Sequence, residues 1–127
     1  MFSHLTVGSN DIARSKAFYD GVTQPLGLVC QTESPGGIGY SRQGGRPQLW
    51  IVLPLDKNAA TVGNGITIGL EADTRPAVDA AYAAAMANGG KDEGTPGLRP
   101  HYHANYYAAY VRDPDGNKVC VVCHKPA

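Results

Sequence analysis

The sequence lacks an excess of charge of either sign, and it lacks any long hydrophobic run. Its 127 residues carry eleven basic and eleven acidic side chains, so the formal net charge at pH 7 is zero. Without a basic cluster, nucleic acid and anionic membrane surfaces are disfavoured as main partners. No apolar segment approaches the ~20 residues that a membrane span requires, and the N-terminus lacks the pattern of a signal peptide. We therefore expect a cytoplasmic protein.

Cysteine is scarce as well. Three cysteines cannot all pair with one another, and a chain of this length buries roughly two-thirds of its unfolded surface without disulfides. Reduced thiols are therefore expected. Cys120 and Cys123 have the spacing of a C-x-x-C motif, but on a strand this spacing sends the two thiols to opposite faces, which argues against a redox pair.

The sequence does contain a strong hairpin signal between Tyr106 and His124. Two short segments rich in β-branched and aromatic residues flank Asp113-Pro114-Asp115-Gly116, and Asp-Gly after a proline is strong turn chemistry. If Arg112 lies opposite Asn117, alternation places Cys120 and Val122 on one face of the hairpin. The opposite face then carries Val119, Val121 and Cys123.

The order of elements repeats after about half of the chain. Residues 2–7 alternate as a strand, and Ser9 or Asn10 would cap a helix that ends at Pro25-Leu26-Gly27. Residues 65–72 and a helix capped by Asp73 or Thr74 restart this pattern. Further strands are predicted at 28–32, 40–42 and 48–53, a glycine-rich turn at 34–39 and a long loop at 94–105. The sequence thus predicts one domain, residues 1–127, with modules at about 1–57 and 63–124.

Four of these strands share one feature, an apolar face opposite a polar, aromatic or thiol side chain. The apolar positions are Leu5 and Val7, Leu49 and Ile51, Ile66 and Ile68, and Val119 and Val121. The opposite positions are His4, Trp50, Thr67 and Cys120. A sheet with helices on its apolar face must curl to shelter the other face. We therefore expect an α+β fold in which two βαβββ modules form a curved mixed sheet around a concave pocket, with the helices on the outer face.

This architecture, the opening MFSHLTVGSNDIARSKAFYDGVTQPLGL and the closing DPDGNKVCVV resemble the vicinal oxygen chelate superfamily, which includes glyoxalase I, the bleomycin and fosfomycin resistance proteins and the extradiol dioxygenases. The segment GLRPHYHANYYAAYVRDPDGN resembles small bacterial glyoxalase-like members. The resemblance implies a small-molecule ligand and a homodimer. In metal-using members it also implies a divalent ion bound by side chains at the positions of His4, Trp50, Thr67 and Cys120.

Only His4 keeps the ligand type that the resemblance implies. Nickel, iron or magnesium needs several nitrogen or oxygen donors, and a tryptophan at one of the four positions supplies none. Zinc could be bound by His4, a Cys120 thiolate and a histidine of the loop. We therefore expect no cofactor, with zinc or another divalent metal as the alternative.

The candidate catalytic residues are His4 and Cys120, and each has a purely structural alternative. His4 is a pocket base or ligand, or else a hydrogen-bonded interior histidine. Cys120 is a nucleophile if His4 lies within hydrogen-bond reach, or else a buried thiol that fills space.

The candidate substrate-binding residues are Trp50, Thr67, Arg99, His101, His103 and Tyr107. Trp50 would stack on a planar ligand or fill the core. Arg99, His101 and His103 lie on the long loop, where they would bind a carboxylate or phosphate, or form a solvated turn or a dimer contact. Tyr107 belongs to the set because the assumed hairpin register places it beside Cys120.

Three functions are compatible with these expectations. The first is a glyoxalase-like lyase or a dioxygenase that acts on a small molecule with a degenerate metal site. The second is a metal-independent protein that binds a small aromatic or anionic compound, as the antibiotic-sequestering members of the superfamily do. A metal-free enzyme that uses His4 as a base or Cys120 as a nucleophile is a third alternative.

Overall fold

Each half of the chain folds into the same order of elements. The computed structural model describes all residues 1–127. The first half contains β1 (Leu5–Gly8), α1 (Ile12–Thr23), the 3-10 turn η1 (Gln24–Leu26), β2 (Leu28–Ser34), β3 (Gly37–Arg42) and β4 (Leu49–Val52). The second contains β5 (Ile68–Glu71), α2 (Arg75–Ala87), β6 (Lys91–Leu98), β7 (Tyr107–Arg112) and β8 (Lys118–Cys123). The predicted α+β fold of two βαβββ modules is confirmed.

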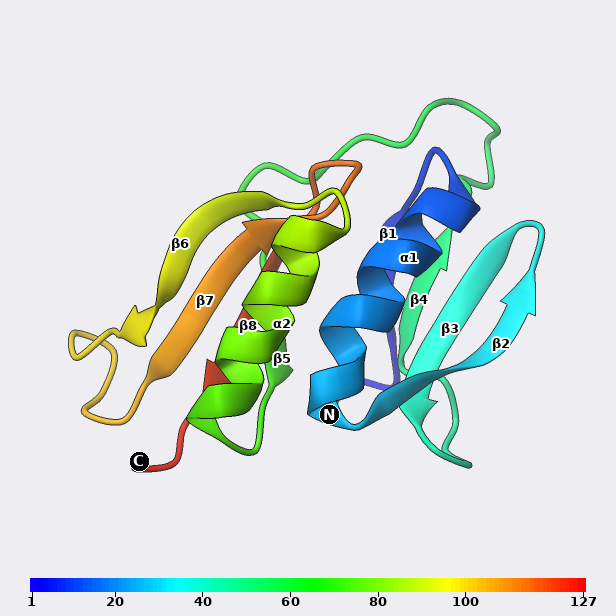
Figure 1. The fold of residues 1–127 in the computed structure, drawn as a ribbon. Coiled ribbons are helices and arrows are strands. Elements are labelled where there is room, and N and C mark those ends of the chain that lie inside the picture. The colour runs from blue at the N-terminus through cyan, green and yellow to red at the C-terminus, as the bar shows by residue number, and fades with distance from the viewer.

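The strands form two separate sheets with the same topology. Their orders are β1-β4-β3-β2 and β5-β8-β7-β6. The β1–β4 and β5–β8 pairs are parallel, and the other pairs are antiparallel. Both helices lie side by side over one face of the two sheets, while β1 and β5 run along the edges that face the middle of the molecule (Figure 1). The other face is therefore free of helices.

Polar caps fix where the two helices begin. Thr74 accepts a hydrogen bond from the N–H of Ala77, as predicted for α2. The cap of α1 is Asp11, which accepts from the N–H of Arg14, and not Ser9 or Asn10. Ser9 instead accepts from the N–H of Asp11, so it supports the cap from two residues earlier in the chain. Neither helix is both long and apolar enough to cross a membrane.

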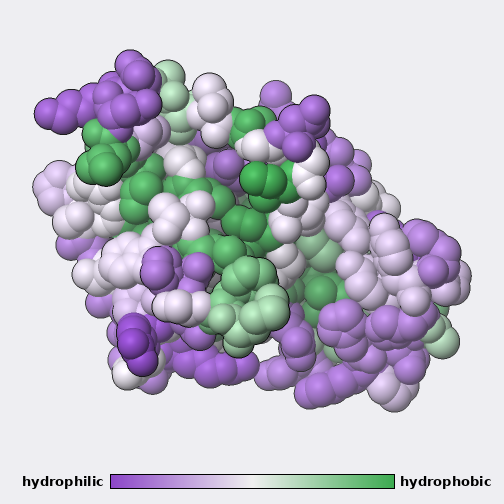
Figure 2. All heavy atoms as spheres, turned by 180° about the vertical axis from the view of Figure 1, so that it is seen from behind, coloured by the Kyte–Doolittle hydropathy of each residue, from purple (hydrophilic) through white to green (hydrophobic).

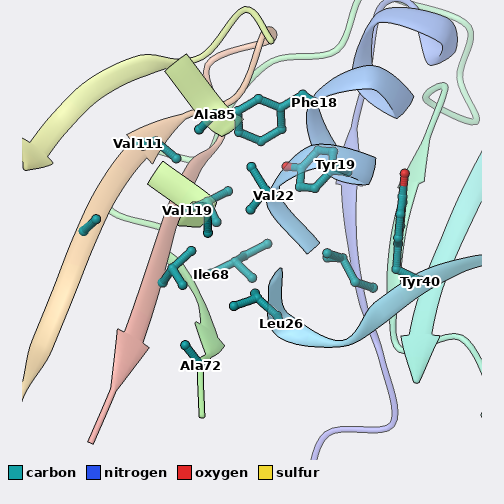
Figure 3. Close-up of a cluster of buried hydrophobic side chains, with 14 of the residues drawn as sticks. Phe18, Tyr19, Val22, Leu26, Tyr40, Ile68, Ala72, Ala85, Val111 and Val119 are labelled. Atoms are coloured by element: carbon teal, nitrogen blue, oxygen red, sulfur yellow. The ribbon is translucent and has the colours of Figure 1, made fainter. Parts of the chain in front are cut away.

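One hydrophobic core joins the two modules. It contains 18 buried residues, and Phe18, Tyr19 and Val22 of α1 meet residues of α2 and of the second sheet there (Figure 3). The helices approach closely at Gly21, where an added Cβ would lie 3.0 Å from Nδ2 of Asn88 and 3.3 Å from the Cβ of Ala84. A glycine inside a helix costs stability, and here it permits this close helix contact.

The DPDGN turn sets the register of the last hairpin. Gly116 has a φ of 93°, which favours glycine, and the N–H of Asp113 donates to the carbonyl of Asn117 over 2.8 Å. Residues 113–117 therefore all belong to the turn, and the ladder begins with Arg112 opposite Lys118. The predicted faces of β8 are confirmed, because Val119, Val121 and Cys123 join the main core while Cys120 and Val122 lie on the other side.

The assumed pairing of Arg112 with Asn117 is wrong by one residue, and this reverses the faces of β7. Tyr110, not Ala109, lies opposite Cys120. Tyr107 consequently lies on the helix side, where its hydroxyl donates to Asp79 of α2 over 2.6 Å. A slip of one residue moves every side chain of a strand to the opposite face.

Two predicted loops contain more strand than expected. Gly94–Leu98, assigned to a long loop, forms part of β6, and Gly37–Gly39, assigned to a turn, opens β3. Pro96 is tolerated because β6 is the outer edge of its sheet and its pairing with β7 is interrupted between Gly94 and Gly97.

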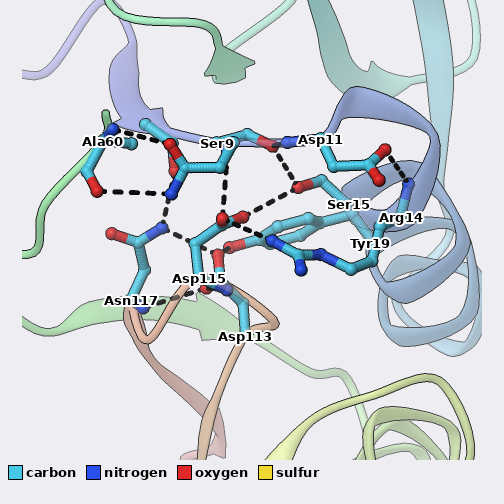
Figure 4. Close-up of polar contacts among 11 residues, drawn as sticks. Ser9, Asp11, Arg14, Ser15, Tyr19, Ala60, Asp113, Asp115 and Asn117 are labelled. Atoms are coloured by element: carbon cyan, nitrogen blue, oxygen red, sulfur yellow. Dashed lines mark hydrogen bonds and ion pairs between the residues drawn. The ribbon is translucent and has the colours of Figure 1, made fainter. Parts of the chain in front are cut away.

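A polar latch connects the turn of the second module to the start of α1. Asp115 accepts hydrogen bonds from the N–H of Asn10 over 2.9 Å, from the Arg14 guanidinium over 2.7 Å and from the Ser15 hydroxyl over 3.2 Å (Figure 4). Its side chain is only 2% exposed. A buried carboxylate with several donors is stable, but removing it leaves those donors without a partner.

The neighbouring Asp113 extends the latch into the core. The hydroxyl of Tyr19 donates to Asp113 over 2.7 Å, and Asn117 donates through its side chain to both Asp113 and the carbonyl of Gly8 over 2.9 Å. Burial raises the pKa of Tyr19 well above its usual value, and the charge of Asp113 raises it further. The Tyr19 phenol therefore stays protonated and serves as a donor at neutral pH.

We expect Asp115→Ala to lower the free energy of unfolding by about 2–4 kcal/mol, since it leaves the Asn10 N–H and the Arg14 and Ser15 side chains without their shared acceptor. Urea denaturation measures the change. Asp56→Ala is the control, because Asp56 is exposed and bonds only within its own loop. Equal stability of the two variants would contradict a role of the latch in holding the modules together.

Candidate functional site

The principal cavity lies where the start of the chain meets both modules. It has a volume of about 710 Å³. Phe2, Ser3, Arg42, Arg46 and Gln48 line it from the first module, and Gly69, Leu70 and Glu71 line it from the second. The charged residues come from the end of β3, the β3–β4 turn and the end of β5, so the cavity exists only when the two modules are packed together.

A smaller apolar chamber of about 200 Å³, the inner chamber, adjoins this cavity. The two share Phe2, Ser3, Leu28, Ser41, Gln48 and Leu70. The chamber adds His4, Leu5, Tyr40, Leu49 and Ile68 to the lining. A ligand that entered the wide part would thus find a hydrophobic recess beside it.

A third hollow of about 490 Å³ lies on the helix-free face of the first sheet. Its lining includes His4, Thr6, Arg46 and Trp50. Trp50 lies against Gly39, where an added Cβ would approach the indole to 3.0 Å. Figure 2 shows this side of the molecule, where hydrophobic residues gather in the middle and hydrophilic residues surround them. His4 and Arg46 each line this hollow and one of the two connected cavities.

His4 is not the interior histidine that one interpretation expected. Its side chain is exposed, and its Nδ1 shares a hydrogen bond of 2.9 Å with the hydroxyl of Ser3. The cavities that His4 lines contain neither Thr67 nor Cys120. His4 and Trp50 therefore share a hollow on the first module, apart from the candidate residues of the second.

Cys120 lies in a small cluster of its own on the second sheet. It is 3% exposed and packs with Ala108, Val122, Tyr106 and Tyr110. The Tyr106 hydroxyl lies 2.9 Å from the Tyr110 hydroxyl and 3.7 Å from Sγ of Cys120. Burial raises the pKa of Cys120, and hydrogen bonds from the two phenols only partly offset this. The thiol is therefore protonated at neutral pH.

The other candidate residues of the second module are dispersed. Thr67 is exposed and precedes β5. Arg99 donates to the carbonyls of Thr95 and Gly97, and its guanidinium lies 5.6 Å from the centre of the Tyr110 ring. His101 and His103 belong to an aromatic cluster with Tyr102, Tyr106 and His124, in which Nε2 of His103 lies 2.8 Å from Nδ1 of His124.

These positions do not fit a divalent ion within one chain. No group of three or more histidine, cysteine, aspartate or glutamate side chains lies close enough together to hold a metal. Of the implied ligand positions, His4 and Cys120 lie in separate places, and the Cys120 thiol is protonated. A hard ion needs several oxygen or nitrogen donors to replace its hydration shell.

Sequence reasoning missed most of the residues that line the principal cavity. Phe2, Arg42, Arg46, Gln48 and Glu71 were not among the candidates, although the two arginines flank the Gly44-Gly45 turn. Their common location depends on how the β3–β4 turn packs against β5. The only local signal was a pair of cations beside a glycine turn, which is also typical of an ordinary exposed loop.

Comparison with known proteins agrees with this architecture. A family model described as the Glyoxalase/Bleomycin resistance protein/Dioxygenase superfamily matches residues 1–121. A glyoxalase/bleomycin resistance protein from Albidiferax ferrireducens T118 is 40% identical, with 99% of each chain covered and a TM-score of 0.86. A lactoylglutathione lyase from Agrobacterium tumefaciens is 22% identical, with 97% of this chain and 92% of that chain covered and a TM-score of 0.63. No match was found among curated proteins. The chain belongs to the glyoxalase/bleomycin resistance protein/dioxygenase superfamily.

Proposed function

We propose that this superfamily member binds a small organic molecule between its modules, without a metal ion. The observation that carries this proposal is the continuous hollow of about 710 and 200 Å³ that Phe2, Ser3 and Leu70 help to line. Pockets for small molecules typically enclose ~300–1,000 Å³ and combine an apolar lining with a few polar groups. The hollow between the modules has this composition.

The two parts of the hollow would contact different parts of a ligand. The inner chamber offers apolar side chains from both modules, such as Leu28, Leu49 and Ile68. Each Å² of apolar surface that a ligand buries there contributes about 25 cal/mol. The polar groups around the wide part restrict how the ligand is oriented. Binding of this kind requires no bond to be broken.

A glyoxalase-like lyase or a dioxygenase is the alternative within the superfamily, but the donor set does not favour it. Such an enzyme uses a metal ion to stabilise an enolate or oxyanion of its substrate. His4 is the only implied position that keeps a metal-ligand side chain. Within one chain, it does not belong to any group of three or more histidine, cysteine, aspartate or glutamate side chains that could hold a metal ion. The homodimer expected from the resemblance remains a prediction.

A metal-free enzyme with Cys120 as its nucleophile is also disfavoured. The thiolate is the reactive form, and burial raises the pKa of Cys120. His4 lies on the other module, so it does not serve as the base for this thiol. We therefore assign Cys120 a packing role beside Tyr106 and Tyr110.

The binding proposal is tested with anilinonaphthalene, a neutral apolar compound that fluoresces when it leaves water. Protein stripped of metal by a chelator should bind it with one site per chain. Phe2→Ala should weaken this binding roughly tenfold, because a phenyl contact is worth on the order of 1–2 kcal/mol. Fluorescence titration measures the affinity.

Leu55→Ala is the matched control, because Leu55 is 97% exposed and does not line the hollow. It should leave the affinity unchanged. Loss of binding on metal removal, or equal affinities of the two variants, would contradict the proposal.

The role of Cys120 is tested by its titration. We expect its Cβ carbon signal in NMR spectra to change only above the usual range of a cysteine, roughly pH 8–9. Replacing both Tyr106 and Tyr110 by Phe should move the midpoint to still higher pH, since their hydroxyls donate to the sulfur and stabilise the thiolate. A midpoint below pH 7 would instead support a nucleophilic Cys120.

A further inference from the structure

We propose that the ligand is an amphipathic organic anion, whose carboxylate, sulfonate or phosphate group binds Arg42 and Arg46 while its apolar part fills the inner chamber. This inference rests on the function proposed above and specifies the chemical class of the ligand. Arg42 is the last residue of β3, and Arg46 lies in the turn that leads to β4. Both line the wide part of the hollow.

A tight turn presents the two guanidinium groups from the same wall. The N–H of Gly45 donates to the carbonyl of Arg42 over 2.8 Å, and Gly44 has a φ of 76°, which favours glycine. The chain therefore reverses between the two arginines. Both side chains are exposed to solvent and need no rearrangement of the core to reach a ligand.

Neither guanidinium has an ion pair, a side-chain hydrogen bond or an aromatic ring beneath it within the protein, and the absence of all three distinguishes the two among the six arginines. The other four have protein partners: Arg14 pairs with Asp115, Arg112 with Glu93, Arg99 donates to backbone carbonyls, and Arg75 lies over the ring of Tyr107. Guanidinium groups bind carboxylate, sulfonate and phosphate oxygens with paired hydrogen bonds. The free donors of Arg42 and Arg46 are available for such a group.

The opposite wall sets the orientation of the ligand. Glu71, at the end of β5, lines the same cavity and has no cation within 4.0 Å. Its carboxylate repels an anionic group from the second module, so the anionic group is directed towards the arginines. The inner chamber adjoins the wide part at Leu28 and Leu70, which line both parts of the hollow. A ligand with one anionic end and one apolar end matches this arrangement.

The test compares anilinonaphthalene with its sulfonate, which has the same rings and one added negative charge. Wild-type protein should bind the sulfonate about tenfold more tightly than the neutral compound at low salt, and added salt should reduce this preference. The double variant Arg42→Gln/Arg46→Gln should lose the preference and still bind the neutral compound. Fluorescence titrations give all four affinities.

Lys57→Gln/Lys91→Gln is the matched control, because it removes the same charge from two exposed lysines that do not line the hollow. It should keep the preference for the sulfonate. Equal preference in the arginine and lysine variants, or no preference in wild-type protein, overturns the inference and leaves the binding function intact. Wild-type protein that binds neither compound overturns the proposed function itself.

Discussion

The packing of the two modules depends on the buried carboxylates of Asp113 and Asp115. Both belong to the turn between β7 and β8, and both accept hydrogen bonds from groups in or next to α1. The two sheets share no ladder of hydrogen bonds, so the connection between the modules relies on the helices, the common core and this latch. Directional hydrogen bonds complement a hydrophobic core that by itself does not specify orientation.

The latch and the hollow lie at opposite ends of β1. Asn117 bonds to the carbonyl of Gly8 at the end of the strand, whereas Phe2 and Ser3, which line the hollow, precede its first residue Leu5. Polar contacts therefore connect the modules near the last residue of β1, whereas the hollow separates them near its first residue. Residues of β5 and of the β3–β4 turn face each other across that open end, which explains why the hollow contains side chains from both modules.

The sequence predicted the two modules and the inward residues of β8 because these depend on local periodicity. Alternation in Lys118–Cys123 separates Cys120 from Val119 and Val121 whatever lies opposite them. The face of Tyr107 depended on the register of the hairpin, and the register depended on how many residues the turn takes. The turn ends at Asn117, because the N–H of Asp113 donates to the Asn117 carbonyl and the Asp113 side chain accepts from the Asn117 N–H. The spacing of apolar residues does not reveal these hydrogen bonds.

The candidate site was harder to predict than the fold because its residues are distant in sequence and are brought together only by the packing of one module against the other. Alternation selected His4 and Cys120 as members of one pocket, but His4 precedes β1 of the first module whereas Cys120 lies on β8 of the second. The alternation of side chains within a strand does not say which strands face each other. The positive charge of the hollow comes from Arg42 at the end of β3 and Arg46 in the turn that follows. A guanidinium attracts an anion and orients it, yet it withdraws less charge from a bound oxygen than a metal ion does. A site built in this way is suited to holding a ligand more than to ionising it.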